Sequence, residues 1–191
     1  MDPRVELVRL LAERSVKFGE FTLSSGKRSD FYVDARLTTM SPEGLRAVGA
    51  AGLGALRERG WEADSVGGLT MGADPVAFAI ALASAVDGTR LLRAFSVRKD
   101  VKAHGTRRRI EGPFREGDRV VIVEDVITTG ASALTAAAAA EHENAKVVGV
   151  LAVLDREEGG REAIEAQGHQ VIALATAREV IRMARAHPSP T

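Results

Sequence analysis

The sequence contains no cysteine, few aromatic residues and no excess of charge of either sign. Without cysteine, the 191-residue chain cannot form a disulfide framework, a thiol nucleophile or a cysteine-ligated metal site. Its 26 basic residues balance its 26 acidic residues, which argues against binding nucleic acid through a basic face. No stretch approaches the ~18 apolar residues of a membrane-spanning helix, and the first residues lack the apolar segment of a signal peptide. We therefore expect a cytoplasmic protein that contacts neither nucleic acid nor membrane.

The sequence has instead the composition and periodicity of one globular domain, residues 1–191. Hydrophobic residues make up 45% and charged residues 27%. Strand-like apolar runs alternate with helical patterns, which predicts an α/β fold whose mostly parallel central sheet is flanked by helices. Strands are expected at 64–69, 91–97, 120–123, 147–154 and 170–174. Helices are expected at 3–14, 42–60, 75–86, 133–140, 158–167 and 176–186.

The most informative stretch joins a buried strand to a helix. Four branched apolar residues, Val120 to Val123, precede two acids, Glu124 and Asp125, where we expect the strand to end. Residues 128–132 then form a loop of small and hydroxyl residues before an alanine-rich helix. Unpaired N–H groups at a helix start can bind a phosphate, and the two carboxylates suit adjacent ribose hydroxyls or hydrated Mg²⁺. This predicts a sugar-phosphate site; the alternative is a plain capped turn.

Residues 120–132 resemble the phosphoribosyl-pyrophosphate (PRPP) signature of the type I phosphoribosyltransferases. The resemblance implies that family's fold, with Mg²⁺ as cofactor held through the substrate rather than by a protein cage, and with Asp125 as the one candidate protein ligand. The signature does not identify the base. The PRPP-binding residues that it implies in this stretch are Glu124, Asp125, Val126, Ile127, Thr128, Thr129, Gly130, Ala131 and Ser132.

A basic loop follows the strand expected at 91–97. It contains Arg98, Lys99, Lys102 and His104, and mobile cations over a phosphate site can neutralise a departing pyrophosphate. The alternative is a solvated surface loop. The pattern Arg-Lys-x-x-Lys-x-His-Gly resembles the catalytic loop of the orotate phosphoribosyltransferase branch, which reaches into the neighbouring subunit. The resemblance implies a homodimer in which all four residues contact PRPP, with Lys102, Arg98 and His104 catalytic.

Two further segments are similar to the same branch. The aromatic-rich residues 16–34 predict a hairpin, which is either a small edge sheet or, by the resemblance, the segment that covers the base. Residues 154–157 are similar to the orotate-binding segment, in which the planar fork of Arg156 suits a carboxylate. The alternative for Arg156 is an ion pair with a neighbouring acid. The resemblance thus implies an N-terminal hood at about 1–40, a PRPP-binding core at about 41–191, and orotate contacts from Thr128, Arg156, Phe31 and Tyr32.

The chain also departs from the family pattern. Ser24 stands where many members carry lysine, with Lys27 as a nearby candidate, and Thr70-Met71 stands where many carry Tyr-Lys. We expect transfer of the 5-phosphoribosyl group from PRPP to orotate, giving orotidine 5′-monophosphate and pyrophosphate in pyrimidine biosynthesis. The alternatives are a phosphoribosyltransferase for another base, such as a purine, and a non-catalytic PRPP-sensing regulator.

Overall fold

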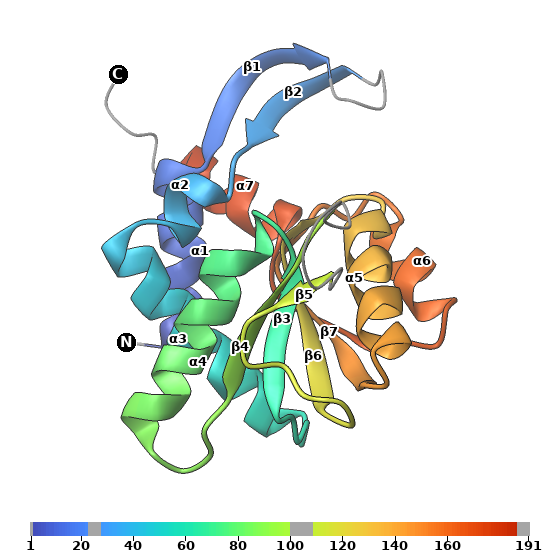
Figure 1. Cartoon of the computed structure of the whole chain (residues 1–191). Helices are drawn as coiled ribbons and strands as arrows, with labels where there is room; N and C mark the ends of the chain where they lie inside the picture. Colours follow the sequence, from blue (N-terminus) through green and yellow to red (C-terminus); the bar gives the residue numbers. More distant parts are fainter. Residues whose placement is uncertain (1, 23–27, 100–108, 187–191) are drawn as a thin grey trace.

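A computed structural model describes residues 2–22, 28–99 and 109–186 (Figure 1). The helices are α1 (Pro3–Arg14), α2 (Arg36–Thr39), α3 (Pro42–Glu58), α4 (Ala73–Asp87), α5 (Ala131–His142), α6 (Gly160–Glu165) and α7 (Ala177–Ala186). The strands are β1 (Val16–Thr22), β2 (Arg28–Val33), β3 (Ser65–Leu69), β4 (Arg93–Val97), β5 (Ile110–Glu111), β6 (Arg119–Ile127), β7 (Lys146–Asp155) and β8 (Val171–Thr176). Within these described ranges, every helix is too short or too polar to cross a lipid bilayer.

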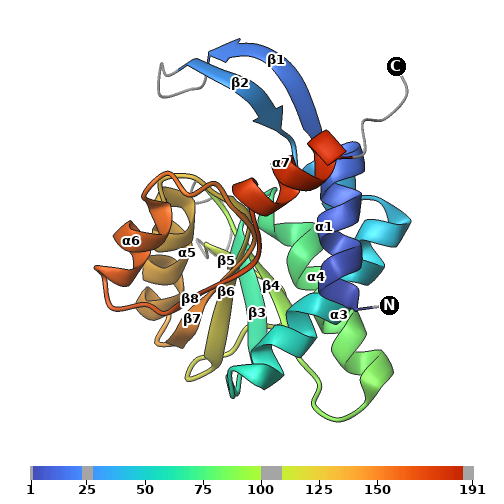
Figure 2. The same ribbon diagram turned by 180° about the vertical axis from the view of Figure 1, so that it is seen from behind.

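A six-stranded sheet of order β5-β4-β3-β6-β7-β8 forms the centre of the molecule. Its neighbouring strands pair in parallel, except that the short β5 runs antiparallel to β4 at one edge. Helices α1, α3 and α4 cover one face and α5 and α6 cover the other, as the two opposite views show (Figures 1 and 2). The predicted α/β fold with a mostly parallel sheet is confirmed.

The core lies on both faces of β6 because alternate side chains of a strand point to opposite sides. Val121 and Val123 belong to the apolar cluster formed with α1, α3 and α4. Val120 and Ile122 belong to a second cluster, with the buried alanines of α5. All four valine and isoleucine side chains are fully buried, so the prediction of a strand covered on both faces is confirmed.

Strand β6 is longer than the sequence predicted. It continues through the two acids to Ile127, because parallel pairing with β7 extends as far as the pair Ile127–Asp155. The prediction that the strand ends before Glu124 was therefore wrong. The short elements α2 and β5 were not predicted, and α6 is shorter than the helix expected at 158–167. These differences arise where neighbouring elements, rather than local residue preference, decide the backbone conformation.

The predicted hairpin is present as a separate two-stranded sheet. Strands β1 and β2 pair antiparallel, with an irregularity between Phe18 and Phe21. The hairpin rises beyond the edge at which the parallel strands end, and α7 runs beneath it (Figure 2). Arg185 of α7 holds this arrangement, since its Nη2 donates to Asp30 Oδ2 at 2.9 Å and its guanidinium carbon lies 5.6 Å from the centre of the Phe18 ring. The C-terminal helix thus anchors the hairpin.

Candidate active site

The candidate site lies at the carboxyl edge of the sheet. Parallel strands present their carboxyl ends at one edge, and ligands of α/β sheets bind in the crevice beyond it. Strands β3, β4, β6 and β7 end at Leu69, Val97, Ile127 and Asp155 respectively. The loops that follow therefore converge, and the residues expected to bind PRPP and the base lie in them, at the strand ends before them, at the start of α5 and in the hairpin.

The turn from β6 into α5 forms a small hollow of about 230 Å³, lined by Glu124 and residues 126–133. Gly130 precedes the first helical residue with a φ of 80°, a left-handed conformation that favours glycine. A Cβ atom at Gly130 would lie 2.7 Å from the carbonyl oxygen of Gly160, so there is also no room for a side chain. No side chain caps the helix at Gly130. The Ala131 N–H donates to Thr129 Oγ1, but the distance of 3.4 Å is long for a hydrogen bond. This helix start is suited to binding an anion.

The two acids of β6 occupy different environments. Because they are consecutive in a strand, their side chains leave opposite faces. Glu124 is 6% exposed, and within the described part of the chain its Oε2 atom has no hydrogen-bond partner. Burial, aided by the charge of neighbouring Asp125, raises the pKa of Glu124 to about 9. Glu124 is therefore protonated at neutral pH, and its buried oxygen is free to bond a ligand.

Asp125 faces the loop that joins β3 to α4. Its Oδ1 accepts a hydrogen bond from the Val126 N–H at 2.8 Å. A Cβ atom at Gly72 would lie 2.5 Å from the same oxygen, so only glycine lets the loop approach this closely. The peptide bond between Thr70 and Met71 in that loop is cis. Asp125 and the β3–α4 loop thus form one wall of the site.

The basic loop begins at the same edge. Arg98 follows β4, and its Nη1 lies 3.6 Å from Glu111 Oε1. Its buried Nε has no hydrogen-bond partner among the described residues, while Arg109 Nε donates to the Arg98 carbonyl at 3.1 Å. Lys99 is exposed. The predicted catalytic residues Lys102 and His104 lie outside the described residues.

Arg156 joins the core to the hairpin. Its side chain is 6% exposed, and its Nε and Nη2 donate to Glu158 Oε1 at 3.1 and 2.7 Å. Its guanidinium carbon lies 5.1 Å from the centre of the Phe31 ring, and its backbone N–H donates to the Ile127 carbonyl at 2.9 Å. The expected base-binding residues Arg156 and Phe31 are therefore in contact next to Thr128. The alternative given for Arg156, an ion pair with a neighbouring acid, is also observed, and the acid is Glu158.

Tyr32 lies differently from Phe31. Neighbouring side chains of a strand point to opposite faces, so the two rings leave β2 on different sides. The Tyr32 ring packs against Phe21 with 5.7 Å between ring centres, and 38% of the residue is exposed. The structure therefore brings Phe31, but not Tyr32, to the Arg156 guanidinium. The orotate contact of Tyr32 stays a prediction.

One cation near the site was not singled out from the sequence. Arg36, the first residue of α2, donates from Nε and Nη2 to the two oxygens of Asp34 at 2.9 and 3.0 Å. These hydrogen bonds raise the pKa of Arg36, with smaller contributions from Tyr32 and Asp125, which therefore lie within electrostatic range. Arg36 and Met71 line the same hollow. The Asp-x-Arg spacing was the only local signal.

The described residues contain no cluster of three or more metal-binding side chains. Asp125 nevertheless offers carboxylate oxygens of the kind that Mg²⁺ prefers, whereas the protonated Glu124 is suited to hydrogen bonding rather than to binding the ion. A hydrated ion carried by a diphosphate needs only one or two such ligands. The site is thus compatible with a Mg²⁺ ion held largely through the substrate.

Comparison with known proteins identifies relatives along almost the whole chain. Residues 41–172 match the phosphoribosyl transferase domain family. Over 181 residues the chain is 45% identical to the orotate phosphoribosyltransferase of Aquifex aeolicus, covering 93% of this chain and 97% of the relative. The orotate phosphoribosyltransferase of Pyrococcus furiosus is 42% identical over 180 residues, covering 94% and 96%.

Solved structures agree with these relatives. The Mycobacterium tuberculosis orotate phosphoribosyltransferase in complex with PRPP superimposes with a TM-score of 0.78 at 39% identity, covering 93% of this chain and 98% of the other. The same enzyme with Fe(III) dicitrate gives a TM-score of 0.82 at 43% identity and the same coverage. The adenine phosphoribosyltransferase of Saccharomyces cerevisiae, at 20% identity and a TM-score of 0.66, shares the fold.

Proposed function

Since this chain belongs to the orotate phosphoribosyltransferases of the phosphoribosyltransferase family, we propose that it transfers the 5-phosphoribosyl group of PRPP to orotate. The products are orotidine 5′-monophosphate and pyrophosphate, in de novo pyrimidine biosynthesis. One observation carries the proposal: the hollow at the start of α5 lies beside Arg156, which stacks on Phe31. A phosphate site and a site for a planar anion thus adjoin.

The turn after β6 binds the sugar phosphate in this proposal. The N–H groups of Thr129 to Ser132 and the hydroxyls of Thr128, Thr129 and Ser132 donate to the 5-phosphate, and the start of α5 adds partial positive charge. The backbone of Val126 and Ile127 shapes the hollow. Gly130 lets the turn pack against the Gly160 carbonyl, where a residue with a side chain would collide. Negative charge on the ligand is then met mostly by amide donors.

Glu124 and Asp125 bind the ribose hydroxyls. A protonated Glu124 can both donate and accept a hydrogen bond, so its unpaired buried oxygen gains a partner when the sugar binds. Asp125 would be the protein ligand of Mg²⁺, completing a shell made mostly of substrate oxygens and water. The ion would supply positive charge to the diphosphate.

The reaction needs positioning and charge stabilisation, because no residue acts as a nucleophile. The bond between ribose C1 and the diphosphate oxygen breaks with oxocarbenium character. A ring nitrogen of orotate forms the new bond to C1 from the opposite face and loses its proton to solvent, and the electrons of the broken C1–O bond leave with pyrophosphate. Lys102 stabilises or protonates the leaving group, assisted by Arg98 and His104, and Lys99 contributes a further PRPP contact.

Arg156 selects the base. Orotate is a planar anion with a carboxylate and ring carbonyls, and a guanidinium matches both. Glu158 occupies two of the five N–H donors of Arg156, so the rest remain for the base. Phe31 stacks on the same guanidinium and Thr128 borders it, while Tyr32 closes the hairpin side. A purine lacks the carboxylate and would gain little from Arg156.

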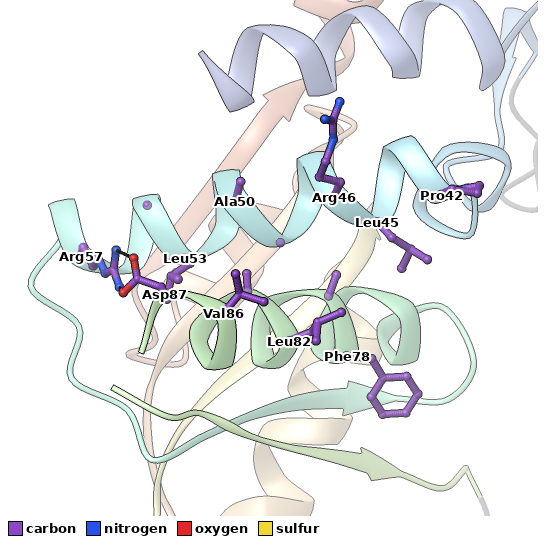
Figure 3. A pocket seen from close by; sticks show the side chains of 14 residues that line it. Pro42, Leu45, Arg46, Ala50, Leu53, Arg57, Phe78, Leu82, Val86 and Asp87 are labelled. Atoms are coloured by element: carbon purple, nitrogen blue, oxygen red, sulfur yellow. Dashed lines mark hydrogen bonds and ion pairs between the residues drawn. The ribbon is translucent and has the colours of Figure 1, made fainter. Parts of the chain in front are cut away.

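We also propose that the protein is a homodimer joined through the groove between α3 and α4, with the basic loop of one subunit completing the other subunit's site. Figure 3 shows Phe78, Leu82 and Val86, spaced four apart, along the outer side of α4. They are 52%, 67% and 81% exposed and border a groove of about 760 Å³ that the ion pair between Arg57 and Asp87 closes at one end. Such an apolar surface favours contact with a second copy.

The test of the proposed function is direct turnover. Pure protein is mixed with PRPP, Mg²⁺ and orotate, and the loss of orotate absorbance is followed, with adenine, guanine and hypoxanthine in parallel reactions. Turnover of orotate alone supports the proposal, and turnover of a purine instead supports the other-base alternative. Failure with every base, together with binding of DNA or RNA at physiological salt, would favour the regulator.

Two other expectations stay predictions. Cell fractionation tests the cytoplasmic location, and limited proteolysis tests the division into a hood at about 1–40 and a core at about 41–191.

A further inference from the structure

The β3–α4 loop at the proposed diphosphate site carries no positive charge. Its residues, Thr70 to Gly72, include no charged side chain, although Gly72 lies directly against Asp125. A diphosphate leaving group carries several negative charges, and catalysis requires them to be neutralised as the bond to ribose breaks. In the proposed function the basic loop and Mg²⁺ supply part of that charge, which leaves this side of the site open to a cation from another element.

Arg36 lies at that position. It lines one hollow with Met71, whose neighbour Gly72 touches the Asp125 carboxylate, and it is within electrostatic range of Asp125 itself. About half of its side chain is exposed, so a ligand can reach it. Asp34 accepts from Nε and Nη2 and thereby holds the guanidinium from one edge. Because a guanidinium has five N–H donors, three remain for a second anion.

We infer that Arg36 binds the diphosphate of PRPP and supplies the positive charge that the β3–α4 loop lacks. The paired edge fixes the guanidinium, and the free edge meets phosphate oxygens, an arrangement in which arginine binds planar or tetrahedral anions well. Asp34 acts as a positioning residue in this inference, because its two carboxylate oxygens accept hydrogen bonds from Arg36. The inference rests on the proposed PRPP chemistry and adds one residue to it.

Ligand affinities separate this role from a general effect on the site. Dissociation constants are measured calorimetrically, in Mg²⁺, for PRPP, pyrophosphate and ribose 5-phosphate. In Arg36→Gln and Arg36→Ala, PRPP and pyrophosphate should bind about tenfold to a hundredfold more weakly, the range for loss of a charge-assisted hydrogen bond. Ribose 5-phosphate, which lacks the diphosphate, should change less than twofold. Arg36→Lys should recover part of the affinity for PRPP.

The control is Arg9→Ala on α1. Like Arg36, the Arg9 side chain is about half exposed and paired with acids, in this case Glu6 and Glu13. It should leave all three affinities unchanged. Equal weakening of all three ligands in the Arg36 variants, or no weakening of PRPP, overturns the inference. Thermal unfolding of each variant is recorded. If Arg36→Ala fails to fold, the affinities of Arg36→Gln decide the test.

Turnover of orotate by the wild type is measured first. No turnover refutes the proposed function, whereas normal turnover together with unchanged PRPP affinity in Arg36→Gln refutes only the role of Arg36.

Discussion

Protonation of Glu124 in the folded protein should make stability depend on pH. The pKa of this buried acid is about 9 when folded, against an ordinary value of 4.5 when unfolded. Between these values the folded state binds more protons than the unfolded state, so the stabilising contribution is complete below about pH 4.5 and is lost as pH rises towards 9. Glu124→Gln keeps the shape of the side chain and removes the titration.

The size of the effect follows from the width of that pH window. A fully shifted group changes the free energy of unfolding by about 1.4 kcal/mol per pH unit. From pH 5.5 to pH 8.5, the stability of Glu124→Gln should therefore rise relative to the wild type by an amount approaching 4 kcal/mol. Because the two proteins differ only at residue 124, the pH-dependent part of the difference reports the ionisation of Glu124.

The assay is urea unfolding followed by circular dichroism at several pH values, with both proteins at the same concentration since a dimer's stability depends on it. The wild type should lose stability with rising pH faster than Glu124→Gln. Asp125→Asn is measured in the same series. It removes the neighbouring charge that helps to raise the pKa of Glu124, so its stability should fall less steeply with rising pH than that of the wild type. A difference between wild type and Glu124→Gln that does not vary with pH would mean that Glu124 is ionised when folded, and the reasoning from burial would be wrong.

Three further substitutions test separate parts of the account. Arg156→Ala should lower kcat/KM for orotate about a hundredfold, since a buried charge-assisted contact of about 3 kcal/mol is lost, and an unchanged value would refute its role in base selection. Gly130→Ala should cost about 1–3 kcal/mol in chemical unfolding and weaken PRPP binding, because its φ is 80° and the new Cβ would collide with Gly160; full stability would contradict this. Leu82→Glu should give monomers in light scattering and little turnover, whereas a stable dimer would exclude the groove between α3 and α4. A fourth test mixes Lys102→Ala with Gly130→Ala, each of which should have low activity alone: the mixture should recover part of the activity if the basic loop of one subunit serves the neighbouring subunit's site, and no recovery would contradict a shared loop.

Local residue patterns were enough to predict the parts of the site that belong to one segment. The run from Val120 to Ser132 has the apolar strand, the small-residue turn and the helix-forming alanines in one stretch, so its conformation depends little on distant residues. The alternation of strands and helices likewise predicted the parallel sheet. The hairpin followed from its aromatic segments and its polar turn.

Features that depend on packing between distant segments could not be predicted from the sequence. Strand β6 continues through Glu124 because β7 pairs with it, and the raised pKa of Glu124 follows from burial that only the folded chain creates. The resemblance implied that Arg156 and Phe31 both contact orotate, but the stacking of one on the other follows from the packing of the N-terminal hairpin against the turn after β7. Arg36 lies in a helix of four residues, too short to have a periodic pattern, and its place beside Met71 is a property of the fold.

A crystal structure of the protein with PRPP and Mg²⁺ tests the central claim most directly. The account predicts that the 5-phosphate lies on the N–H groups of residues 129–132, with the ribose hydroxyls on Glu124 and Asp125. An occupied PRPP molecule bound elsewhere, with the turn after β6 empty, would contradict it.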